Sequence, residues 1–214
     1  MKTAAREALP GWVALLIMAA LAWRRTLADA AMMLPAIAPV AILWSRSIAL
    51  TPGIPMRILR LGLFACGYLL VWSAAGFLAF VIMRPIEFGL DEGVYSSRAA
   101  AVAIFAMAGA YQLSPLREAC LAKCRSPLTV LGIATSGPPV LRDLRAGALH
   151  GAWCLACCWA LMAVLALVGL MNVAAMVVLA VFIFVEKTTR FGVPAGRAAG
   201  MLMLATAAAV LVTH

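Results

Sequence analysis

The sequence carries little charge for its length. Only 12% of its 214 residues are charged, whereas 66% are hydrophobic and the mean hydropathy is +1.06. A soluble domain of this size has far more polar surface, so the composition argues against an ordinary soluble enzyme or binding module. An integral membrane protein is the class that fits.

Several functional patterns are also missing. The sequence contains no Ser/His/Asp arrangement, no paired carboxylates and no glycine-rich phosphate loop, so no catalytic motif predicts an enzyme. Basic residues interleaved with aromatics are absent, which argues against a nucleic-acid partner even though the net charge is +9. In a membrane protein such charge belongs to the loops, where it sets topology and contacts lipid headgroups.

Hydrophobic residues gather in seven segments. They cover residues 10–23, 29–46, 59–83, 98–113, 148–168, 171–187 and 195–212. Apolar segments of about 20 residues can cross a bilayer as helices, although the first and fourth segments are short for this. The sequence therefore predicts an all-α fold, namely a polytopic transmembrane bundle with about seven helices in one domain over residues 1–214.

The positive charges are shared unequally between the connections. With seven spans, 13 of the 17 Lys and Arg residues lie on the side of the N-terminus. Because cytoplasmic loops are enriched in these residues, we expect a cytoplasmic N-terminus and a periplasmic or extracellular C-terminus. The long connection at 114–147 then lies on the cytoplasmic side.

This long connection begins with a helix signal. Ser114 can cap free N–H groups and Pro115 fits the first turn of a helix, while a second Ser-Pro pair at Ser126 ends the segment. We therefore expect a short helix over Pro115–Arg125, either re-entrant or interfacial.

The predicted short helix carries two cysteines. Cys120 and Cys124 are four residues apart, so they share one face of the helix. This spacing suits a metal better than a mutual disulfide, and the nearby cations Arg117, Lys123 and Arg125 favour thiolates. The alternative is that both cysteines are small packing residues.

A second set of soft ligands follows on the 148–168 segment. On a helix, His150, Cys154, Cys157 and Cys158 share an arc of about 100°, and Met162 lies beside it. Thiolate, imidazole and thioether groups select Cu(I), zinc or an iron–sulfur cluster. We predict a metal site at these residues together with Cys120 and Cys124, with Met32 and Met33 as weaker candidates. Chance clustering of buried cysteines is the alternative.

Two other features have simpler interpretations. Glu186 and Lys187 end the 171–187 segment, and we expect them to form a local ion pair. Covalently attached haem is disfavoured because the sequence has no CxxCH run.

These cysteine motifs resemble a known family, the bacterial predicted metal-binding integral membrane proteins of unknown function that are sometimes labelled copper chaperones. The matching runs are Ala31–Pro35, Tyr111–Leu116, Cys120–Leu128, Cys154–Met162, Gly169–Asn172 and Glu186–Lys187. The resemblance covers most of the chain from residue 28 to about residue 190. It implies metal binding in a bacterial inner (plasma) membrane and names no reaction.

Three functions therefore compete. The first is copper handling, in which the chain binds Cu(I) and exchanges it with a metal donor or acceptor protein; zinc, an iron–sulfur cluster and haem are less favoured cofactors. The second is a membrane thiol-redox protein that uses Cys154, Cys157 and Cys158, although no thioredoxin-like strand pattern accompanies the CxxC spacing. The third is a structural membrane subunit with inert cysteines. Stable disulfides are not expected in the reducing cytoplasm.

Overall fold

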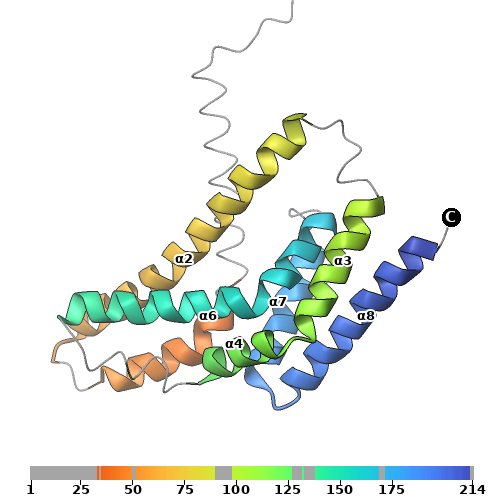
Figure 1. Cartoon of the computed structure of the whole chain (residues 1–214). Helices are drawn as coiled ribbons and strands as arrows, with labels where there is room; N and C mark the ends of the chain where they lie inside the picture. Colours follow the sequence, from red (N-terminus) through yellow and green to blue (C-terminus); the bar gives the residue numbers. More distant parts are fainter. Residues whose placement is uncertain are drawn as a thin grey trace, which may run out of the picture.

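Helices form all the regular structure in the described part of the chain (Figure 1). The computed structural model describes residues 33, 35–49, 52–89, 98–126, 132, 138–168 and 172–212. The helices are α2 (Ile54–Gly89), α3 (Arg98–Gln112), α4 (Pro115–Arg125), α6 (Pro139–Val168), α7 (Val173–Thr188) and α8 (Gly192–Val212); residues 35–47 are also helical. The all-α prediction is confirmed, while the predicted segment 10–23 lies outside the described residues.

Within the described ranges, three helices are long and apolar enough to cross a membrane. They are Ile54–Ala79 within α2, Val140–Leu165 within α6, and α8. Together, α3 and α4 make a fourth candidate that is bent by 62°. The predicted segment 171–187 corresponds to α7, which has 16 residues; at about 1.5 Å per residue it is shorter than a typical hydrocarbon core.

The α6 helix begins earlier than the hydrophobic pattern predicted, at Pro139 instead of residue 148. The additional turns contain Asp143, which is fully buried. Arg60 of α2 donates two hydrogen bonds to this carboxylate, at 2.8 and 3.0 Å. Pairing with Arg60 offsets the cost of burying the charge, so a charged stretch can extend the apolar helix.

The α2 and α6 helices pack closely where residues 64–71 of α2 meet residues 144–151 of α6. A Cβ atom at Gly147 of α6 would collide with the carbonyl oxygen of Phe64, and one at Gly67 of α2 would collide with that of Leu144. Small residues at such crossings let helix backbones approach each other. This contact places the buried aromatic residues of α2 (Phe64, Tyr68 and Trp72) in the same core cluster as the cysteines of α6.

The α3 and α8 helices form a second close pair and lie side by side in Figure 1. A Cβ atom at Gly109 would come within 2.8 Å of the Gly200 carbonyl oxygen. At the other end of the pair, the Arg98 guanidinium donates to the carbonyls of Val210 and Leu211. Because α3 is held in this way, the bend after Gln112 directs α4 towards α6 and α7, which it contacts.

Candidate functional site

The short α4 helix has the predicted bounds and cap. The Ser114 hydroxyl accepts a hydrogen bond from the Arg117 N–H at 3.2 Å, and Pro115 occupies the first turn. Cys120 and Cys124 are both buried, at 6% and 3% exposure. The local signals therefore determine this helix, and its cysteine face points into the protein.

The cysteines of α6 also face the interior. Cys154, Cys157 and Cys158 have at most 2% of their surface exposed, and His150 has 1%. All four lie on the side of α6 that packs against its neighbours, as their helical spacing predicted.

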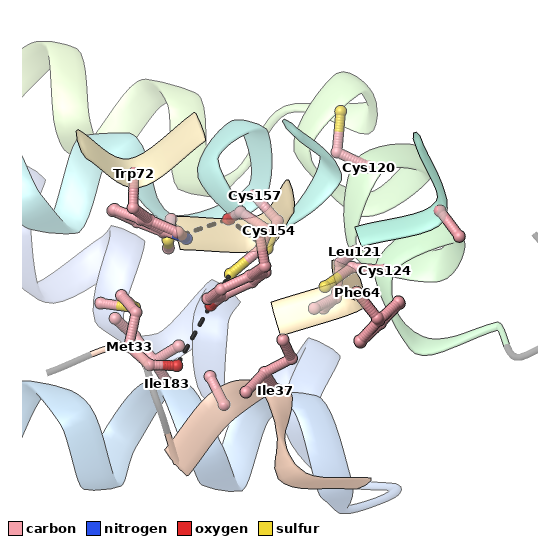
Figure 2. Packing of buried hydrophobic residues seen from close by; sticks show 14 of the residues in the cluster. Met33, Ile37, Phe64, Trp72, Cys120, Leu121, Cys124, Cys154, Cys157 and Ile183 are labelled. Carbon is pink, nitrogen blue, oxygen red and sulfur yellow. Dashed lines mark hydrogen bonds between the residues drawn. The ribbon is translucent and has the colours of Figure 1, made fainter. Parts of the chain in front are cut away.

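The structure brings the two cysteine segments together. Cys124 of α4 lies in the same buried core cluster as Cys154, Cys157 and Cys158 of α6, where α4 packs against α6. Figure 2 shows the side chains from α4 and α6 converging within the core. We call Cys124, Cys154, Cys157 and Cys158 the thiol cluster; all four are free cysteines.

The thiols of the cluster are held by local partners. The Cys157 and Cys158 thiols donate to the Cys154 carbonyl oxygen at 3.1 and 2.9 Å. Across the described ranges, no group of three or more His, Cys, Asp or Glu side chains is arranged to hold a metal ion. Binding by more than two thiols therefore requires side-chain rotation that breaks these weak hydrogen bonds.

Cys120 is separate from the thiol cluster. Its sulfur points away from Cys154 and Cys157 in Figure 2 and approaches the hydroxyl of Tyr111. Tyr111 in turn packs against Trp159, with ring centroids 4.9 Å apart. The structure thus divides the predicted α4 pair, with Cys124 inside the cluster and Cys120 one turn outside it.

His150 does not join the cysteines either. Its ring stacks between those of Phe64 and Tyr68, with centroids 6.4 and 5.8 Å away. Among the described residues, neither ring nitrogen has a hydrogen-bond partner. Burying an imidazole without a hydrogen-bond partner costs free energy. The unpaired ring nitrogens leave His150 able to bind a ligand, although it lies outside the thiol cluster.

The methionine candidates have different positions. Met33 is fully buried, and its carbonyl oxygen accepts a hydrogen bond from the Tyr68 hydroxyl at 3.1 Å. The same hydroxyl lies 3.1 Å from the Cys154 sulfur, so a single side chain separates Met33 from the cluster. Met162 is partly buried and packs against the core, whereas Met32 lies outside the described residues.

Two residues that the sequence analysis did not place at the site contact the cluster. Tyr68 reaches Cys154 from α2, and the Lys187 ammonium donates to the Cys154 sulfur at 2.7 Å from α7. The predicted local ion pair between Glu186 and Lys187 is therefore wrong: Glu186 pairs with Arg117 instead. Consecutive helical residues point about 100° apart, which sends the two side chains to different partners.

The cations that were expected around the α4 thiols have other roles. Arg117 is fully buried against Glu186, Lys123 lies 4.2 Å from the centroid of the Trp153 ring, and Arg125 donates to the Thr189 carbonyl at 2.6 Å. Lys187 of α7, by contrast, donates a hydrogen bond to a cluster thiol, that of Cys154. The expectation that local cations on α4 serve the thiols is thus corrected by the tertiary structure.

The Arg117–Glu186 pair holds α7 against α4. Both side chains are buried, at 0% and 2% exposure, and a Cβ atom at Gly196 of α8 would collide with both of them. Glu186 immediately precedes Lys187. The Arg117–Glu186 pair therefore holds α7 in the position from which Lys187 reaches Cys154.

One family of known proteins matches the chain. No curated protein and no solved structure matches the chain. The model of one family, described as "PpoB2: Copper chaperone", matches residues 20–210, a range that includes the thiol cluster, Cys120, His150 and Lys187. The chain therefore belongs to the PpoB2 copper chaperone family.

Proposed function

We propose that this chain is a membrane protein that carries Cu(I) as cargo on the thiol cluster and exchanges it with a partner protein. The single observation that carries the proposal is the convergence of Cys124 from α4 with Cys154 and Cys157 from α6. Membership of the copper chaperone family supports copper as the cargo. Buried free thiols that meet across two helices are a soft-metal ligand set, and thiolates select copper over hard cations.

The surroundings of the cluster support transient binding of a soft ion. Apolar and aromatic side chains, among them Phe64, Tyr68 and Trp72, enclose the cysteines, and this limits competition by water. Two thiols from different helices suffice for a first Cu(I) contact, and rotation of Cys157 or Cys158 away from the Cys154 carbonyl adds further sulfur. Thiols that bind and release Cu(I) one at a time suit an ion that is transferred to a partner protein.

The remaining candidates extend this proposal outward. Cys120 and Tyr111 lie on one side of the cluster, whereas Met33 and Tyr68 lie on another. We infer that the sulfur atoms of Cys120 and Met33 are secondary copper-binding positions beside the thiol cluster. His150 and Met162 lie nearby. In the membrane, we propose a bacterial inner-membrane location with the N-terminus in the cytoplasm, and a metal donor or acceptor protein as the partner.

Metal content tests the function. Purified protein incubated with Cu(I) under reducing conditions should retain about one or two copper ions per chain. The Cys154→Ser/Cys157→Ser/Cys158→Ser variant should lose this copper, because a hydroxyl is a hard, weak ligand for it. Cys66→Ser is the matched control, since Cys66 is an exposed cysteine of α2. Equal copper in the triple variant and the wild type would refute the site.

Thiol redox chemistry is the second candidate. Its support is that Cys124 and Cys154 come from different helices, so a disulfide between them would join α4 to α6. Counting free thiols in protein isolated without reductant separates the two functions. Full thiol content together with copper binding favours cargo transfer; loss of one thiol pair without copper retention favours redox cycling.

A further inference from the structure

A lysine beside a copper ligand is unexpected, because an ammonium repels a metal cation. Lys187 nevertheless donates to the Cys154 sulfur at 2.7 Å. The contact lies within the protein, where a charge is costly unless it is paired. Of the remaining groups near it, Tyr68 is neutral and the Glu186 carboxylate is already engaged by Arg117. The counter-charge that this geometry provides for Lys187 is therefore a cysteine thiolate.

We propose that Lys187 selects the charge of the cargo, favouring a monovalent ion over a divalent one at the thiol cluster. This inference rests on the proposed function and adds to it the property by which Cu(I) is distinguished from Zn(II). Its basis is a count of charges at a site where two thiols from different helices meet and where the described residues offer no ready set of three ligands.

The charge balance favours Cu(I). Cu(I) bound by two thiolates forms a complex with one net negative charge, which the Lys187 ammonium neutralises. Loading starts from the Cys154 thiolate and its ammonium: one Cu(I) enters, one thiol proton from Cys124 or Cys157 leaves to solvent, and the buried site stays neutral throughout. No electron is transferred, because the ion arrives and leaves as Cu(I).

The same balance disfavours Zn(II). Zinc bound by two thiolates is neutral, so the nearby ammonium is left as an unpaired, partly buried cation. Neutrality would require a third thiolate, which means rotating Cys157 or Cys158 away from the Cys154 carbonyl. Lys187 therefore acts as a positioning and selecting residue, and it does not need to bind the metal itself.

Substitution of Lys187 tests this inference. In Lys187→Met, Cu(I) affinity should fall and Zn(II) affinity should rise, so that the Cu(I)-to-Zn(II) affinity ratio falls about tenfold or more, the size expected for loss of a charge-assisted contact. Lys187→Arg keeps the charge and should keep the ratio. Lys123→Met is the matched control, because it removes an equal charge from α4 where the ammonium lies over Trp153.

The affinities are measured by competition with a Cu(I) chelator and, separately, with a Zn(II) chelator on the purified full chain. A Lys187→Met ratio equal to that of the wild type overturns the inference. If Lys187→Met does not accumulate as folded protein, Lys187→Gln, which keeps a donor but no charge, is scored by the same rule. Failure of the wild type to bind cysteine-dependent Cu(I) would instead remove the proposed function, and the inference with it.

Discussion

The buried Arg117–Glu186 pair makes a quantitative prediction about stability. Replacing Glu186 with leucine leaves the Arg117 guanidinium buried without a counter-charge, and replacing Arg117 with methionine does the same to the carboxylate. Removing one partner of a buried ion pair costs about 3–5 kcal/mol of unfolding free energy. For a chain of this size that loss corresponds to a Tm about 6–20 °C lower.

The double variant Arg117→Met/Glu186→Leu should behave differently. Neither charge remains, and apolar replacement of a whole buried pair is often neutral or stabilising. We therefore expect the double variant to recover most of the stability lost in each single variant. The wild type, the two single variants and the double variant are compared by thermal unfolding in detergent, with the loss of folded protein as the signal.

The Arg197–Glu118 pair is the matched control for this cycle. It joins α8 to α4 at 2.7 Å, but its arginine side chain is 57% exposed, and exposed pairs contribute about 0–1 kcal/mol. Additive losses in the Arg117/Glu186 double variant, or equal losses at both pairs, would refute the argument that burial makes this pair hold α7 in place.

Two further predictions concern the packing that assembles the cluster. Gly147→Ala puts a Cβ atom against the Phe64 carbonyl oxygen, so α2 and α6 must separate. We therefore expect a lower Tm and weaker Cu(I) retention. Gly62→Ala is the control on the same helix pair; its Cβ atom meets open space, so it should change neither quantity. Ser114→Ala removes the α4 cap at a cost of about 1 kcal/mol, and hydrogen exchange should increase at α4 while α8 is unaffected; unchanged exchange at α4 would show that packing alone holds this helix.

Much of the local structure was predictable from the sequence. The Ser-Pro start of α4 and the helical spacing from His150 to Cys158 are patterns whose physical causes lie within a few residues. The extension of α6 to Pro139 was missed because the hydrophobic pattern cannot anticipate that Asp143 is neutralised by Arg60, 83 residues away.

The cysteines of the candidate site were predictable from the sequence, whereas the residues that surround them were not. Cysteines are few and chemically distinctive, so their spacing identified Cys124, Cys154, Cys157 and Cys158. The residues that contact them were not placed at the site: Lys187 stood out only within the Glu186–Lys187 run of the family resemblance, and Tyr68 was one more aromatic in the 59–83 segment. Glu186 and Lys187 were wrongly paired because neighbours in sequence were assumed to be neighbours in space.

By itself, the sequence determined that the chain is helical, that it has helices long and apolar enough to cross a membrane, and that cysteines share faces on two of them, since hydropathy, capping and helical spacing act locally. Only the tertiary structure decided which thiols meet, that Cys120 and His150 stand apart, and that Lys187 is the cation at Cys154. The contacts responsible join residues 86, 69 and 33 positions apart, and such contacts depend on how α2, α4, α6 and α7 pack.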